Sequence, residues 1–160
     1  MSELTTLDYT VGMPRSQPRS IRFDEGVLAR LAAYVAAHPG TSQSTEANRF
    51  VDEALRMAEH PGIFFRDGAS GRRAVIVAGP DVWEIIRAIR RTREAMPELD
   101  SEGVLALVRT NTGVSDRDLR IAISYWSAYP GEIDAWIGDA ERFERTFEDE
   151  WRRGQELLGG

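Results

Sequence analysis

The sequence predicts a mainly α fold with short β elements, and three observations support this prediction. Apolar residues recur at three- and four-residue steps over most of the chain after residue 24, which is the period of an amphipathic helix. Residues 20–23 alternate between polar and apolar, as in a short strand. Two runs rich in β-branched and aromatic residues flank an Asp-Gly/Ser-Gly turn between residues 62 and 80, which predicts a β-hairpin.

Composition limits the classes of function. Of the 160 residues, 42% are hydrophobic, which is enough for a core, and no run approaches the roughly 18 apolar residues that span a membrane. There is no cysteine, so disulfides and thiol chemistry are excluded. His38 and His60 stand alone beside prolines, and the sequence has no phosphate-binding glycine loop. We therefore expect no enzyme activity, no metal and no cofactor, and, without a secretion signal, a cytoplasmic protein.

The net charge of −6 argues against a simple nucleic-acid-binding protein, because phosphate contacts need a cationic surface. The distribution of the charge is more informative than its sum. From residue 101 to the end there are seven arginines and twelve acids, so most of the excess negative charge lies in this part. A small DNA-binding domain joined to an acidic partner-binding region has this pattern, and so do many ordinary domains.

The N-terminal part begins with residues 1–14, which lack periodicity and are expected to form a flexible arm. The strand predicted over residues 19–23 has no neighbour in this part of the sequence to accept its hydrogen bonds. We therefore expect it to pair with its own copy in a second chain. Pro18, Ser20 and Arg22 then lie on the exposed face of a two-stranded ribbon.

Two helices are predicted after this strand. The first begins after Asp24, a suitable N-cap, and ends near Ala37, before the break at Pro39-Gly40. Ser42 or Ser44 is expected to cap the second helix, which ends near residue 59. The free amides at the start of a helix form a natural phosphate site.

A strand, a helix, a Gly/Ser break and a helix within about 45 residues resemble the ribbon-helix-helix DNA-binding domain of the Arc, MetJ and CopG class. The matching residues are Arg19 to Glu25 and the second helix from Ser42 onward. In that family the ribbon reads bases in the major groove and the second helix start clamps the phosphates. The resemblance therefore implies that the DNA-binding residues are Pro18, Arg19, Ser20, Arg22, Thr41, Ser42 and Ser44. Pro18 departs from the family, because its side chain offers no hydrogen bond.

The middle of the chain is expected to hold the hairpin of residues 62–80 and a helical region over residues 81–131. Arg66, Arg72 and Arg73 gather near the hairpin tip, where they either contact DNA as a wing or form a solvated turn. Helices near 82–95, 101–112 and 116–128, with Gly113 between the last two, form a helix-turn-helix shape. Because the candidate reading helix begins with acids that would face phosphate, a structural or partner-binding use is the preferred interpretation.

The hairpin followed by these helices resembles the homeodomain-like domain that is appended to VapB-type antitoxins. The phrases that carry the resemblance are Phe65-Arg66-Asp67-Gly68, Gly79-Pro80-Asp81-Val82-Trp83-Glu84 and Tyr129-Pro130-Gly131-Glu132-Ile133-Asp134. Together with the first domain, the resemblance covers roughly residues 19–140.

The C-terminal region, residues 132–160, predicts one long amphipathic helix with an aromatic stripe. Aromatic and arginine side chains dominate binding hot spots, so this helix is a candidate ligand for a groove on a partner protein. Packing against its own domain or its dimer mate is the alternative. The candidate partner-binding residues are Trp136, Arg142, Phe143, Arg145, Phe147, Trp151, Arg152 and Arg153.

These resemblances imply a homodimeric repressor, with its ribbon-helix-helix domain over residues 15–61, that is the antitoxin of a type II toxin-antitoxin system. It would bind operator DNA and neutralise a PIN-domain ribonuclease toxin, and the helix arginines would pair with the acidic metal-binding cluster of that toxin. A stand-alone transcriptional regulator without a toxin is the main alternative. A structural adaptor that uses the aromatic helix without DNA is a second one.

Overall fold

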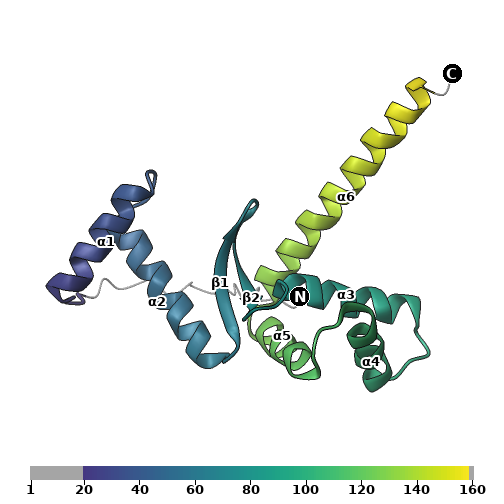
Figure 1. Ribbon diagram of the computed structural model, residues 1–160, viewed down its shortest axis with the longest axis horizontal. Helices are drawn as coiled ribbons and strands as arrows, with labels where there is room; N and C mark the ends of the chain where they lie inside the picture. The colour runs from purple at the N-terminus through teal and green to yellow at the C-terminus, as the bar shows by residue number, and fades with distance from the viewer. Residues whose placement is uncertain (1–19, 159–160) are drawn as a thin grey trace, which may run out of the picture. The chain divides into compact units, whose positions relative to one another are not determined.

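The computed structural model describes residues 20–158, and within them the fold is mainly helical with one antiparallel β-hairpin, as the sequence predicted (Figure 1). The chain divides into two compact units, residues 1–46 and 47–160. The elements are α1 (Glu25–Ala37), α2 (Gln43–Glu59), β1 (Ile63–Gly68), β2 (Gly71–Ile76), α3 (Val82–Ala95), α4 (Ser101–Thr112), α5 (Asp116–Ala128) and α6 (Pro130–Leu158). None of the helices in residues 20–158 is long and apolar enough to cross a membrane.

The first unit contains α1 and the start of α2. Residues 20–24 belong to no helix or strand of their own chain, and Asp24 leads into α1 with extended backbone angles. Leu31 is the buried apolar residue of α1, whereas Leu28 and Ile21 are 41% and 69% exposed. The break after α1 contains Gly40, whose φ of 103° is readily adopted by glycine alone. This unit therefore presents apolar side chains to solvent.

The helix α2 begins in the first unit and ends in the second. Its start is capped by Ser42, whose Oγ accepts a hydrogen bond of 3.1 Å from the Thr45 amide. Ser42 is one of the two residues that were predicted to cap this helix. In its second half, Phe50, Val51 and Leu55 are 36%, 45% and 57% exposed. These three apolar side chains of α2 are thus open to solvent in the single chain.

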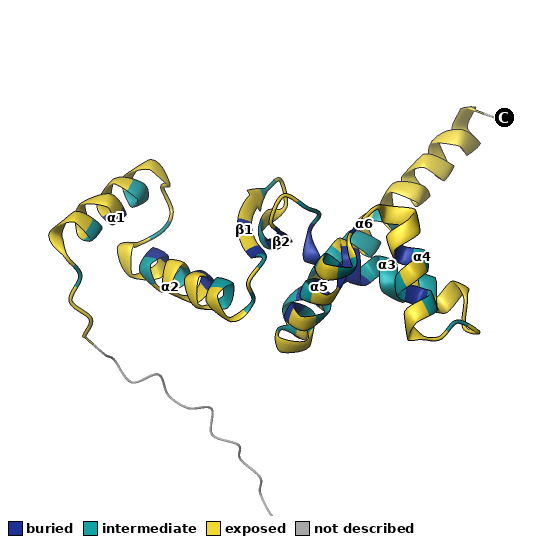
Figure 2. Ribbon diagram, turned by 60° about the horizontal axis from the view of Figure 1, so that its bottom comes forward, coloured by how far each residue is buried: buried dark blue, intermediate teal, exposed yellow. Residues whose placement is uncertain are grey.

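The second unit is built on one core that the hairpin and four helices share. The strands pair in register from Ile63 with Ile76 to Gly68 with Gly71, and one face of the hairpin is buried. Figure 2 shows buried positions in the hairpin and in α3 to α6, and exposed positions over most of the surface. The core residues are Ile63, Phe65, Ala74, Ile76, Val82, Ile85, Ile86, Val104, Val108, Val114, Leu119, Ala122, Tyr125, Ile133 and Ile137.

Local signals fix the helix boundaries in this unit. Asp100 accepts a hydrogen bond of 2.8 Å from the Gly103 amide at the start of α4, and Ser115 caps α5 in the same way through Asp118. Between them, Gly113 ends α4 with a φ of 72°. The last helix begins at Pro130 rather than near residue 132, because proline suits the first turn, where its missing amide hydrogen is not needed.

The long helix α6 has two different halves. In the first half Ile133 and Ile137 are buried in the core. Ion pairs between α3 and α6 extend this attachment, with Arg90 2.6 Å from Asp134 and Arg91 2.7 Å from Glu144. From residue 145 onward every described residue is exposed, and α6 extends beyond the core of its unit (Figures 1 and 2).

Candidate functional site

The predicted base-reading residues are only partly within the described residues. Pro18 and Arg19 lie outside them. Ser20 and Arg22 are exposed, in a segment that pairs with neither β1 nor β2. Residues 20–23 make no backbone hydrogen bond to another described residue.

The three predicted phosphate-clamping residues lie together at the start of α2. Ser42 is engaged as the helix cap, and its Oγ also lies 2.9 Å from the Thr45 hydroxyl. Thr41 donates a hydrogen bond of 2.8 Å to the carboxylate of Glu46, which is buried. Ser44 is exposed and makes no hydrogen bond with a described residue. The hydroxyls of Thr41 and Ser42 are thus engaged within this helix start, and the buried Glu46 places negative charge beside it.

The hairpin arginines are occupied in ion pairs. Arg72 makes two hydrogen bonds, of 2.6 and 2.8 Å, to Glu53 of α2. Arg66 and Arg73 both contact Asp81, a carboxylate that is 2% exposed and leads into α3. These bonds tie the hairpin to α2 and to α3, which supports the structural interpretation of the arginines over a DNA-binding wing.

Asp81 is a buried acid at the centre of this arrangement. Burial alone raises the pKa of its carboxyl, but the hydrogen bonds from Arg73 and Arg66 outweigh burial and the pKa is lowered overall. Trp83 donates a further hydrogen bond of 3.2 Å from its indole. Sequence analysis did not single out Asp81, although its place between Pro80 and an apolar run is a signal for a helix cap.

A second polar cluster joins α2 to α5 and α6. The Arg56 guanidinium contacts Glu132 and donates a hydrogen bond of 3.1 Å to the Tyr125 hydroxyl, while its Nε lies 2.9 Å from Asp52 without hydrogen-bond geometry. Burial raises the pKa of Tyr125, which is fully enclosed. The end of α2 is therefore fixed to the second unit, and this cluster holds its elements together.

The supposed reading helix of the second unit, α5, faces the core. Leu119, Ala122 and Tyr125 of this helix are buried. The acids at its start are engaged locally, since Asp116 pairs with Arg120 and Asp118 is bound by Ser115. This arrangement agrees with the structural use that the acids in its first turn indicated.

The aromatic residues predicted to bind a partner gather on one face of α6. Phe143, Phe147 and Trp151 are 74%, 61% and 62% exposed, at four-residue steps that place them on one stripe. Trp136 continues the stripe toward the core. Its side chain is partly buried and packs beside Gly71 at the hairpin tip. We call the face formed by Trp136, Ala140, Phe143, Phe147, Trp151, Gly154 and Leu158 the aromatic stripe.

The four predicted arginines do not share the aromatic stripe. At about 100° of rotation per residue, they lie roughly 120–160° around the helix from the middle of the stripe. Two of them form ion pairs within the helix, Arg142 with Asp139 and Arg152 with Asp149. Arg145 and Arg153 make no ion pair with a described residue. The structure therefore separates the predicted partner-binding residues into two groups on different faces.

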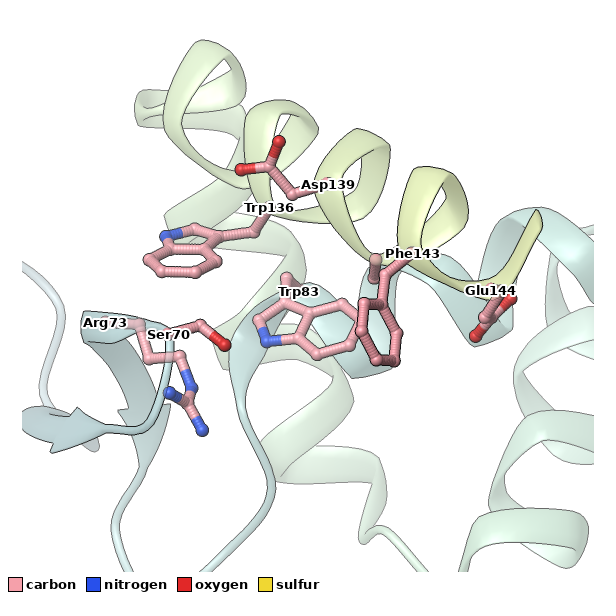
Figure 3. Close-up of a pocket in the computed structure, with 8 residues that line it drawn as sticks. Ser70, Arg73, Trp83, Trp136, Asp139, Phe143 and Glu144 are labelled. Atoms are coloured by element: carbon pink, nitrogen blue, oxygen red, sulfur yellow. The ribbon is translucent and has the colours of Figure 1, made fainter. Parts of the chain in front are cut away.

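A hollow of about 450 Å³ lies where the stripe meets the hairpin tip and α3. Figure 3 shows the rings of Trp83, Trp136 and Phe143 grouped around it, with Arg73 and Ser70 on the hairpin side. The hollow and the exposed stripe are continuous, because Phe143 belongs to both. Sequence analysis missed Trp83 here, because its position beside Val82 on α3 indicated only core packing.

Among residues 20–158, no group of three or more His, Asp or Glu side chains could hold a metal ion. A scan of family models finds no match to the chain, and searches of curated proteins and of solved structures find none either.

Proposed function

We propose that this protein is the antitoxin of a type II toxin-antitoxin pair, in which the N-terminal region forms a DNA-binding dimer and α6 binds and neutralises a PIN-domain ribonuclease. The observation that carries the proposal is the aromatic stripe, whose distal residues Phe147, Trp151 and Leu158 are 61%, 62% and 80% exposed. A soluble chain rarely exposes so many large apolar side chains together unless another molecule covers them.

The N-terminal part of the proposal rests on the segment at residues 20–24 and on the helix α1. Residues 20–23 make no backbone hydrogen bond to another described residue, and Ile21 is 69% exposed. Pairing with a second copy satisfies those backbone groups and covers Ile21, while Ser20 and Arg22 stay on the outer face of the ribbon. Such a ribbon with the Ser42-capped helix start beside it matches the ribbon-helix-helix expectation.

Arg22 gives a direct test of the DNA-binding part. Arg22→Ala is expected to weaken operator binding by about 1–3 kcal/mol, because an arginine on the ribbon contacts a base edge or a phosphate. The matched control is Arg30→Ala, which removes an exposed arginine from α1 and should leave the gel-shift titration nearly unchanged. Equal effects of the two substitutions would contradict the ribbon assignment.

To test the partner-binding part, a truncation must remove only the second half of α6 and leave the first half, which belongs to the core. Removing the whole region from Glu132 takes away Ile133, Ile137 and the Arg56 contact, and so disrupts the core. Removing residues 146–160 leaves these groups and the Glu144 ion pairs in place. We expect this shorter truncation to keep the second unit folded and to remove partner binding.

The deciding experiment combines the truncation with substitutions on the stripe. Phe147→Asp and Trp151→Asp are expected to abolish neutralisation of the co-expressed ribonuclease, because large aromatic side chains act as binding hot spots. Glu156→Arg is the control on the opposite face of the helix. Operator binding should persist in all three. If the stripe variants still neutralise the ribonuclease, α6 is not the binding element; if no ribonuclease binds but DNA does, the chain is a stand-alone regulator.

A further inference from the structure

The aromatic stripe of α6 follows an 11-residue repeat. Its positions are spaced by steps of four, three and four residues, and this pattern of steps recurs every eleven residues. Eleven residues make three turns at about 3.67 residues per turn, which is close to the 3.6 residues per turn of a straight helix. The stripe therefore runs almost parallel to the helix axis, over roughly 33 Å at 1.5 Å per residue. The repeating sets are Trp136, Phe147 and Leu158; Ala140 and Trp151; Phe143 and Gly154.

Gly154 is the smallest residue of the stripe, and no close neighbour among the described residues requires a glycine there. It lies inside the regular part of α6, and a Cβ added there would meet no atom within 4 Å. A glycine inside a helix weakens it, relative to alanine, by about two- to fivefold in the equilibrium constant. Glycine is otherwise used where another backbone must come close. Among the described residues, no backbone comes close to Gly154.

The borders of the stripe indicate the chemistry of the surface that would cover it. On α6 after Phe143, the charged residues within about 100° of the middle of the stripe are carboxylates, namely Glu144, Glu148 and Glu150. The arginines lie farther around the helix. Glu144 is paired with arginines of α3, but Glu148 and Glu150 make no ion pair with a described residue. A second copy of α6 would bring acids against acids in either direction, which is unfavourable.

Resting on the proposed function, we infer that the ribonuclease receives α6 in an apolar groove that is bordered by basic side chains on both sides, and that its main chain crosses α6 at Gly154. The aromatic side chains around this point fill the groove, and the glutamates pair with its borders. The arginines on the far side of α6 stay outside the groove. This assigns recognition to the stripe and its acidic borders.

The test for the close approach uses two glycines of the same helix. Full-length chains are titrated with the PIN-domain ribonuclease that the proposed function assigns as the partner, with binding followed by calorimetry. Gly154→Ala is expected to bind about tenfold more weakly and Gly154→Leu still more weakly, because added atoms separate the two backbones. Gly131→Ala is the control, since Gly131 also meets no atom within 4 Å but lies about 160° from the stripe. Its affinity should stay within about twofold of the wild type.

Helix stability in the free chain distinguishes a lost contact from a damaged helix. Gly154→Ala should raise the helicity of the free protein, measured by circular dichroism, while weakening the complex. Binding of Gly154→Ala at wild-type affinity overturns the close approach and leaves the proposed function intact. Absence of any binding by the wild type overturns both. A change in the chain's own oligomeric mass in Gly154→Leu, measured by light scattering, would identify a second copy as the occupant and overturn the inference.

Charge reversal tests the borders of the groove. The double variant Glu148→Arg and Glu150→Arg is expected to bind the ribonuclease at least about tenfold more weakly at low salt, and added salt should reduce that loss. Glu156→Arg, on the opposite face, should bind as the wild type does. Unchanged binding by the double variant would show that the groove is not bordered by basic residues.

Discussion

The two units of this protein differ in how much of their apolar surface they bury for themselves. Of the seventeen buried apolar residues in the described chain, Leu31 alone belongs to the first unit, and the other sixteen lie in the second. A unit without a core cannot offset the entropy of ordering its chain. The second unit therefore has a core of its own, whereas the described part of the first unit leaves apolar side chains exposed that the proposed dimer would cover.

The largest loss of stability is expected from a substitution that creates a cavity in the core of the second unit. Leu119→Ala, at a fully buried position, is expected to lower the free energy of unfolding by about 4 kcal/mol. All four tryptophans lie in the second unit, so their fluorescence reports the unfolding of that unit in urea. Leu157→Ala, at an 84% exposed position, is the control and should change little. A wild-type fluorescence midpoint that shifts with protein concentration would show that the second unit is not self-sufficient.

The next largest effect is expected at the buried carboxylate of Asp81. Asp81→Asn should cost about 3 kcal/mol at pH 7, because Arg66 and Arg73 lose the charge that they share. The folded pKa of Asp81 is lowered, so its contribution to stability is present above its unfolded pKa and is lost as the pH falls below about 4. The difference between the two proteins should therefore shrink in acid.

The exposed pair of Asp139 and Arg142 provides the control for Asp81. Both side chains are more than half exposed, and exposed ion pairs contribute little to stability. Asp139→Asn should leave the urea midpoint nearly unchanged at every pH. If Asp81→Asn lost the same stability at pH 3 as at pH 7, the buried charge would not be the source of the effect.

The first unit is expected to respond to a change in its exposed apolar face. Leu28→Asp should weaken self-association by about 2 kcal/mol, because it places a charge in the surface that the proposed dimer covers. Analytical ultracentrifugation over a dilution series measures this effect. Ala29→Asp, on the opposite side of α1, should not change the dissociation constant. A wild-type chain that stays monomeric at all concentrations would remove the basis for the dimer.

The sequence predicted the local elements well and the long-range contacts poorly, for a physical reason. Helix limits depend on nearby residues such as Pro39, Ser42 and Gly113, which act within one turn. The contacts of Glu53 with Arg72 and of Arg56 with Glu132 depend on how distant segments pack, and charge pattern alone did not predict them. The break between the two units inside α2 is likewise invisible to helical periodicity, which continues without interruption across it.

For the candidate site, the aromatic stripe was predictable because its spacing is that of a helix face. The grouping of the arginines with the aromatic residues was not supported by the same spacing, since rotation of about 100° per residue separates them. Residue type suggested that the aromatic and arginine side chains form one binding surface, whereas helix geometry places them on two different faces of α6. The hollow beside Trp83 required the packing of α3, α6 and the hairpin tip, none of which a linear pattern contains.

The smallest expected effect sharpens the contrast between the units at the start of α2. Ser42→Ala removes the side chain that accepts the Thr45 amide and should cost about 1 kcal/mol of helix stability. Because Ser42 lies in the first unit, the loss should appear in circular dichroism at 222 nm while the tryptophan fluorescence midpoint stays in place. Ser44→Ala is the control: Ser44 lies within α2 and makes no hydrogen bond with a described residue, and alanine is the better helix former, so its substitution should be neutral or slightly stabilising. Equal losses in the two variants would mean that the helix start is not held by Ser42, and a shift in the fluorescence midpoint would mean that the two units unfold together.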